Sequence, residues 1–125
     1  MEKLYTKIKE IVFMKEHVME KVTEFDILEA LREINDPEIP LDIVSLGFIR
    51  EVKIDEDNNL SIVATLTTQD CPMESYIVRS IVGKLKDTFP SLNEISIKFD
   101  FSNPWNTDFI SSEGKEKLRN LGWKI

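Results

Sequence analysis

The period of the hydrophobic pattern changes twice between Leu60 and Phe101, and this change limits the folds open to the chain. Apolar residues first alternate, as in a half-buried strand, then recur every four positions, as on one face of a helix, and then alternate again. The three runs are Leu60, Ile62, Ala64 and Leu66; Met73, Ile77, Ile81 and Leu85; and Ile95, Ile97, Phe99 and Phe101. The pattern predicts strands over 60–67 and 95–101, joined by a helix that ends at Phe89-Pro90.

Residues that typically begin and end helices locate the helix and the strand that are expected before residue 60. Thr23, with Asp26 three residues later, is typical of a helix N-cap, and Asn35-Asp36-Pro37 should end that helix. A strand over 48–54 then pairs with the strand over 60–67 through a turn at 55–59 that is rich in Asp and Asn. In the second strand, Ser61, Thr65 and Thr67 should face away from the apolar side.

A short last helix is expected after Pro104-Trp105, with Ser111 or Ser112 as its cap and Gly122 just past its end. Trp105 and Trp123 both suggest packing, the latter against the sheet. The order is α-β-β-α-β-α, which predicts an α+β fold with a small mixed three-stranded sheet packed with helices.

The chain divides into an N-terminal helical extension over 1–22 and one domain over 23–125. The apolar residues of the extension fall near one face of a helix. His17, which lies in the extension, is assigned no role. A formal net charge of −7 argues against binding to nucleic-acid phosphates. No apolar run is long enough for a membrane span, and one cysteine excludes an intramolecular disulfide framework, so the cytoplasm is the expected compartment.

Cys71, the single cysteine, is expected where the helix after the second strand begins, because proline is favoured in a first helical turn. A thiolate is stabilised at a helix N-terminus, and Thr67, Thr68 and Asp70 would lie close by. Taken by itself, this pattern slightly favours an inert helix cap, since buried free cysteines are common. Asp36 and Glu38, taken by themselves, are most simply solvated carboxylates in a proline-rich loop, but beside a thiol they could bind a metal or move protons.

Three motifs in order carry a resemblance to a known family: Asp36-Pro37-Glu38-Ile39-Pro40 with Asp42-Ile43-Val44-x-Leu46-Gly47, then Leu66-Thr67-Thr68-x-x-Cys71-Pro72, then Pro104-Trp105. Together they resemble the metal-sulfur cluster biosynthesis family that includes SufT and the PaaD-like proteins, over roughly residues 23–125. The resemblance implies an iron-sulfur cluster assembly domain-like fold. It also implies that Asp36, Glu38, Thr67, Thr68 and Cys71 form the functional site.

The role implied by the resemblance is a stand-alone, non-enzymatic factor in the maturation of iron-sulfur proteins. Cys71 would be a transient or shared ligand of iron or of a cluster, with no cofactor bound permanently. One thiolate supplies one of about four cluster ligands, so a cluster would need a homodimer, a partner or small thiols. The expected partners are client iron-sulfur apoproteins and assembly-scaffold proteins.

Two other functions remain open from the sequence. The chain could be a metal-free adaptor that recruits client apoproteins, in which case the motif around Cys71 is structural. A thiol-dependent enzyme acting on a small molecule is the third option, although the only histidine that could serve as its base lies in the 1–22 extension.

Overall fold

The computed structural model describes residues 21–69 and 71–125, and of Cys71 it describes the backbone only. The elements follow in the order α2 (Glu24–Leu31), β1 (Ile49–Ile54), β2 (Leu60–Ala64), α3 (Cys71–Thr88), β3 (Ile95–Phe99), the short 3-10 helix η2 (Thr107–Phe109) and α4 (Ser112–Asn120). Residues 1–20, with most of the expected helical extension and His17, lie outside the described residues. Within the described residues, no helix has the length and apolar character needed to cross a bilayer.

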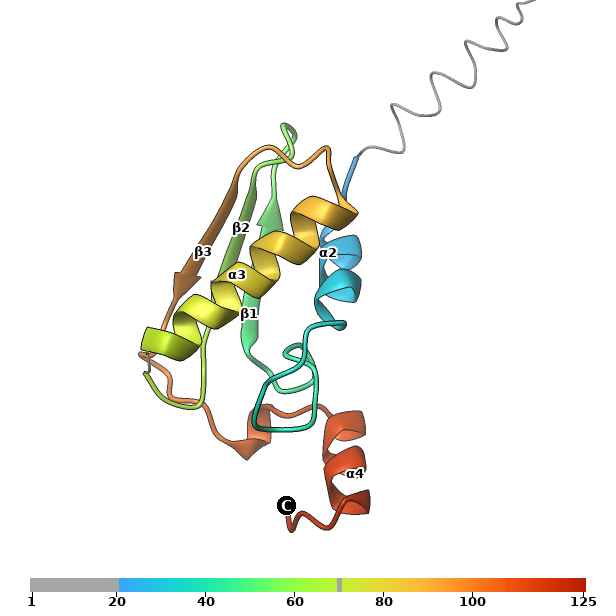
Figure 1. Ribbon diagram of the computed structural model, residues 1–125, viewed down its shortest axis with the longest axis vertical. Coiled ribbons are helices and arrows are strands. Elements are labelled where there is room, and N and C mark those ends of the chain that lie inside the picture. Colours follow the sequence, from blue (N-terminus) through green and yellow to red (C-terminus); the bar gives the residue numbers. More distant parts are fainter. Residues whose placement is uncertain (1–20, 70) are drawn as a thin grey trace, which may run out of the picture.

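The sheet has the order β1-β2-β3 and is mixed, as expected from the sequence (Figure 1). β1 and β2 form an antiparallel hairpin, and β2 and β3 are parallel and joined through α3. Asp55 holds the hairpin turn, because its carboxylate accepts hydrogen bonds from the amides of Asp57 at 2.8 Å and Asn59 at 3.0 Å. The α+β class is therefore confirmed.

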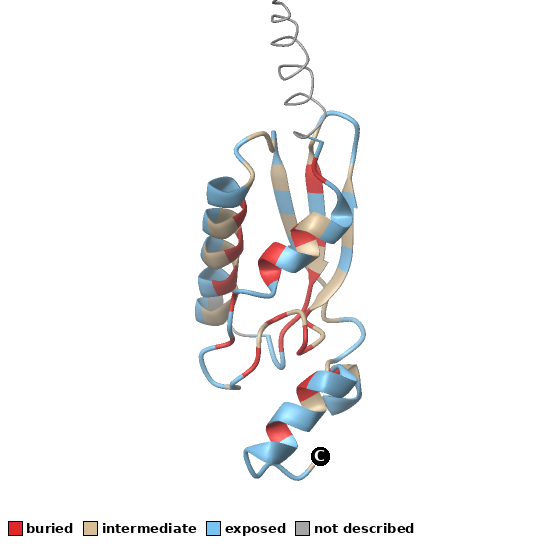
Figure 2. Ribbon diagram, turned by 90° about the vertical axis from the view of Figure 1, so that its right-hand side faces the viewer, coloured by how far each residue is buried: buried red, intermediate tan, exposed pale blue. Residues whose placement is uncertain are grey.

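Two layers enclose the core. α2 and α3 cover one face of the sheet, and no described element covers the other face (Figure 2). This arrangement follows from the strand alternation, since Leu60, Ile62 and Ala64 are buried while Ser61 between them is exposed. From the helices, the fully buried residues Ile27, Leu31, Ile77, Ile81 and Leu85 meet that face. Val22, on the extension side of the expected boundary, is also buried in this core.

The start of α2 is set by local hydrogen bonds. Thr23 Oγ1 accepts from the Asp26 amide at 3.1 Å, and the Asp26 carboxylate accepts from the Thr23 amide at 3.0 Å, which confirms the expected cap. The helix ends at Leu31, earlier than expected. The reason is that the residues after the helix already pair with the following loop. The Ile43 amide donates to the Ile34 carbonyl at 2.9 Å, and Asn35 forms an antiparallel bridge with Asp42.

Two predictions about side-chain placement are wrong. β2 ends at Ala64, and Thr65, expected to face away from the apolar side, is only 1% exposed, with its amide donating to the Phe48 carbonyl at 2.8 Å. Trp123 does not pack against the sheet: the residue is 40% exposed. The reason is that α4 lies beyond the lower end of the sheet (Figure 1), where its N-cap residue Ser111 donates its amide to the Ser45 carbonyl at 2.8 Å.

Trp105 closes the core as predicted. Its indole Nε1 donates to the Leu46 carbonyl at 2.6 Å, and its ring meets the edge of Phe48 with the centroids 5.9 Å apart. This contact ties the segment after β3 to the loop that precedes β1. The segments at 35–47, 65–69 and 100–106 thus gather at the same end of the sheet, where β2 and β3 end and α3 begins (Figure 1).

Candidate functional site

A small polar pocket lies at this end of the sheet. It has a volume of about 50 Å³ and is lined by Asp36, Glu38, Leu66, Thr67, Thr68 and Met73. Four of the five site residues expected from the sequence are therefore brought together from two separate segments. The pocket lies where β2 leaves the sheet and α3 starts, the end at which α/β units commonly place ligands.

Asp36 shapes one wall of the pocket. The residue is 9% exposed, and its Oδ2 accepts hydrogen bonds from the amides of Glu38 at 2.8 Å and Ile39 at 2.7 Å. Its own amide donates to the Leu41 carbonyl at 3.0 Å. This carboxylate is therefore a structural part of the loop as well as a candidate ligand. Oδ1 accepts no hydrogen bond from the described part of the chain and is the oxygen left for chemistry.

Glu38 adds a second carboxylate, and its position follows from Asp36. Its side chain is exposed, whereas its backbone amide is fixed by the Asp36 carboxylate. A substitution that removes the Asp36 carboxylate therefore also removes the hydrogen bond that fixes the Glu38 backbone.

Thr67 and Thr68 form the opposite wall and are both exposed. They sit on the bend that follows β2, and the buried Thr65 anchors that bend to Phe48. The sequence singled out Thr67 and Thr68 but missed Thr65 as their support. It also missed Leu66 and Met73 as lining residues, because both were assigned to apolar core stripes.

Cys71 is the first residue of α3, which agrees with its expected place at or beside the N-cap. Pro72 is the second helical residue, where its lack of an N–H costs no hydrogen bond. Thr68 and Met73, three residues before and two after Cys71, both line the pocket. The expected neighbour Asp70 lies outside the described residues.

The pocket offers oxygen donors from two carboxylates and two hydroxyls. Such donors suit hard cations, whereas iron-sulfur clusters are held mainly by thiolates. Among the described residues, no group of three or more histidine, cysteine, aspartate and glutamate side chains is arranged to hold a metal ion. What the pocket itself can do is receive a small polar species and hydrogen-bond it.

Comparison with known proteins decides the family. The family model described as "iron-sulfur cluster assembly protein" matches residues 24–99, a span that contains all five candidate residues. The chain belongs to this family. The family resemblance drawn from the motifs is therefore confirmed.

Individual family members agree in sequence and in structure. The chain is 34% identical over 100 residues to the Fe-S protein maturation auxiliary factor YitW of Bacillus subtilis, covering 80% of this chain and 97% of that protein. It is 31% identical over 83 residues to the Fe-S protein maturation auxiliary factor SufT of Staphylococcus aureus, covering 66% of this chain and 93% of SufT. A solved domain from Bacillus anthracis, titled a domain of unknown function, superposes with a TM-score of 0.73 at 34% identity over 77% of this chain and 91% of that domain.

Proposed function

We propose that this chain is a maturation factor for iron-sulfur proteins in which Cys71 is a transient or shared ligand of iron or of a cluster that is passed on to a client. The observation that carries the proposal is the convergence of Asp36, Glu38, Thr67 and Thr68 on one pocket beside the first turn of α3. Relatives similar along most of their length are named Fe-S protein maturation auxiliary factors, which supports the same role.

Each group contributes a distinct property in this proposal. The backbone amides in the first turn of α3, which have no acceptor within the helix itself, favour the thiolate form of Cys71, the form that binds metal. The Thr67 and Thr68 hydroxyls donate hydrogen bonds to a sulfur or anionic ligand next to it. Asp36 Oδ1 and Glu38 accept protons released when a thiol becomes a ligand. The metal or cluster is cargo, and a single thiolate makes it easy to release.

The partners in this proposal are client apoproteins and the scaffold proteins that assemble the cluster, in the cytoplasm. The chain carries no turnover reaction of its own. A cluster needs further thiolates, which come from the client, from a scaffold, from small thiols or from a second copy of the chain.

The test is anaerobic transfer of iron and sulfide to an apo-enzyme that requires a [4Fe–4S] cluster, such as apo-aconitase, with and without this chain. The native chain should accelerate activation, and Cys71→Ser should lose roughly 10-fold of that acceleration, as is typical when a ligand environment is altered. Thr88→Ala, at the exposed last residue of α3, is the control and should act as the native chain does.

Each alternative outcome has one meaning. Equal acceleration by the native chain and by Cys71→Ser would remove the ligand role and favour the metal-free adaptor. No acceleration by the native chain would overturn the proposal. Circular dichroism melts of each variant show that any loss does not come from unfolding.

A further inference from the structure

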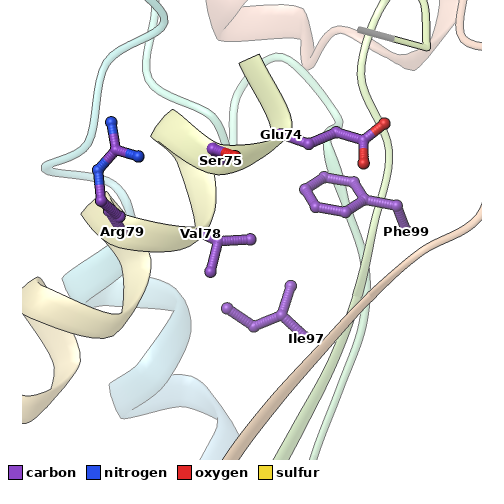
Figure 3. A pocket seen from close by; sticks show the side chains of 6 residues that line it. All are labelled: Glu74, Ser75, Val78, Arg79, Ile97 and Phe99. Atoms are coloured by element: carbon purple, nitrogen blue, oxygen red, sulfur yellow. The ribbon is translucent and has the colours of Figure 1, made fainter. Parts of the chain in front are cut away.

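A groove lies between β3 and α3, on the face of the sheet that the helices cover. It has a volume of about 350 Å³ and is lined by Ile97 and Phe99 from the strand and by Glu74, Ser75, Val78 and Arg79 from the helix. Val78 and Ile97 point toward one another across it (Figure 3). Because a cavity of about 150 Å³ holds a benzene molecule, the groove has room for one long side chain and part of the backbone that carries it.

The floor of the groove is an apolar surface that the fold covers only in part. Ile95, Ile97 and Phe99 alternate with exposed residues along β3, yet each of the three is only half-buried. Their neighbours on β2 are fully buried, because β2 has a strand on each side, whereas β3 is the outermost strand of the sheet. The Phe99 ring also stacks on that of Phe101, with the centroids 6.1 Å apart. An aliphatic and aromatic surface is thus left open to a side chain from outside.

Glu74 supplies the charge beside this surface. Its side chain reaches the Phe99 ring, whereas the guanidinium of Arg79 is turned away from the strand (Figure 3). The Glu74 carboxylate makes no ion pair or hydrogen bond with any of the described residues. Lys98 alternates with Ile97 and Phe99 and therefore lies on the opposite face of the sheet. A carboxylate next to an aromatic ring and aliphatic side chains complements a cation carried on an apolar stem.

Other carboxylates lie at the same end of α3. Met73, which lines the polar pocket together with Asp36 and Glu38, directly precedes Glu74. The chain as a whole carries a formal net charge of −7. A basic segment is therefore attracted to this part of the molecule, and an acidic one is repelled. Lysine and arginine both pack an aliphatic stem on apolar surface, and the planar guanidinium of arginine also stacks on aromatic rings.

We propose that the groove between α3 and β3 binds an arginine or lysine side chain of a partner protein. The aliphatic stem lies on Ile97 and Val78. The cation lies between the Glu74 carboxylate and the Phe99 ring. Because Glu74 is less than one helical turn after Cys71, the partner residues next to the bound side chain lie near the start of α3. In identifying the partner as a client apoprotein, the proposal rests on the proposed function.

The test compares two acetylated and amidated peptides, glycine-leucine-arginine-leucine-glycine and the same peptide with citrulline in place of arginine. Citrulline has nearly the shape of arginine but carries no charge. Each peptide is titrated into the full ¹⁵N-labelled chain. The arginine peptide should shift the backbone amide signals of the groove residues and bind roughly threefold or more tightly than the citrulline peptide. This preference should shrink at high salt, because the charges are close to solvent.

Two variants separate the contributions of the charge and of the ring. Glu74→Gln should reduce the preference for arginine roughly twofold or more, and Phe99→Leu, which keeps the groove apolar, should reduce it by a similar factor. Asp87→Asn, at an exposed position in the last turn of α3, changes the net charge as Glu74→Gln does and should keep the native preference. Glu74 also lies in the first turn of α3, where an acidic group stabilises its own helix. Comparing both peptides on the same variant removes that effect.

The outcomes separate this proposal from the proposed function, since the titration needs no iron and no client. No shifts in the groove with millimolar peptide, equal affinities of the two peptides, or an unchanged preference in Glu74→Gln would overturn the proposal. A homodimer that buries the groove would also overturn it, because the occupant would be a second copy. Full client activation by a Glu74→Gln chain that has lost the preference would overturn the client as partner. If the native chain prefers the arginine peptide but activates no client, the proposed function fails and the binding of a basic side chain stands.

Discussion

At the scale of single residues, the loop that carries Asp36 and Glu38 is held by a few hydrogen bonds and by one close backbone approach. Besides the Asp36 turn, Asp42 Oδ2 accepts from the amides of Val44 at 3.0 Å and Ser45 at 2.9 Å. Gly47 ends the loop with φ +79°, and a Cβ built there would lie 2.8 Å from Phe109 Cβ and closer still to the Phe109 carbonyl oxygen. Only glycine fits both the backbone angle and the space.

Gly47→Ala should therefore destabilise the fold through two effects that add. The left-handed backbone costs about 1 kcal/mol or more for a residue with a Cβ, and the clash with Phe109 costs about 1–3 kcal/mol. A total of about 3 kcal/mol is expected in the free energy of unfolding. Urea denaturation followed by circular dichroism measures it.

Two other glycines separate these effects. Gly122 also has a positive φ, +101°, but a Cβ there meets nothing within 4 Å, so Gly122→Ala should cost only about 1 kcal/mol. Gly83, within α3, has open space around it, and Gly83→Ala should stabilise by about 1 kcal/mol through helix propensity. Equal losses at Gly47 and Gly122 would show that the contact with Phe109 carries no cost.

The residues of the pocket show what could be foreseen at this scale. Thr67, Thr68, Asp36 and Glu38 were found because short motifs keep their order and spacing along the chain. Thr65 was not, because alternation predicts which way a side chain faces only while the strand stays in the sheet. β2 ends at Ala64, and a hydrogen bond to Phe48, distant in sequence, decides where Thr65 goes.

At the scale of elements, helix starts were predictable because they depend on neighbours in sequence. The capping box at Thr23 and the cap at Ser111 both involve a side chain and an amide three residues on. The position of α4 was not predictable, because the sequence of this nine-residue helix does not determine which surface of the domain it packs against. That is why Trp123 was wrongly assigned to the sheet although the helix itself was expected.

The two adjacent serines at the start of α4 give a prediction at the scale of elements. Ser111 Oγ accepts from the Gly114 amide at 3.0 Å as the N-cap, whereas Ser112 is the first helical residue. Ser111→Ala should cost about 1 kcal/mol of unfolding free energy, and Ser112→Ala should be neutral or slightly stabilising. Urea denaturation of the two variants checks this, and the reverse order would move the cap to Ser112.

At the scale of the whole molecule, the architecture was predictable because one helix between two strands leaves few ways to bury both apolar faces. What could not be foreseen is the consequence of a sheet that has three strands among the described residues. One face and the outer edge of β3 stay open among the described elements, and both depend on strand order, which no local pattern encodes. The groove between α3 and β3 appears only when the two elements are placed together.

The pH dependence of the stability is also a property of the whole molecule. Two carboxylates at opposite ends of the sheet determine whether the stability rises or falls with pH. Hydrogen bonds from the backbone and then the side chain of Asn59 lower the pKa of Asp55 below 3.8. The Ser102 hydroxyl, 2.6 Å away, and then its amide lower the pKa of Asp100 below the same value. Since each folded pKa is below its unfolded value, their stabilisation is fully present above pH 3.8 and is lost as the pH falls through the lowered values.

The melting temperature should therefore stay nearly constant from about pH 7 to about pH 5 and fall below about pH 4. The double variant Asp55→Asn with Asp100→Asn should melt lower than the native chain at neutral pH, and the two curves should converge in acid. Convergence is expected because protonation removes from the native chain the same ionised hydrogen-bond acceptors that the variant lacks. Thermal melts followed by circular dichroism at a series of pH values measure both curves. A constant gap down to the most acidic point would mean that these carboxylates stabilise the fold by geometry alone and not through their charge.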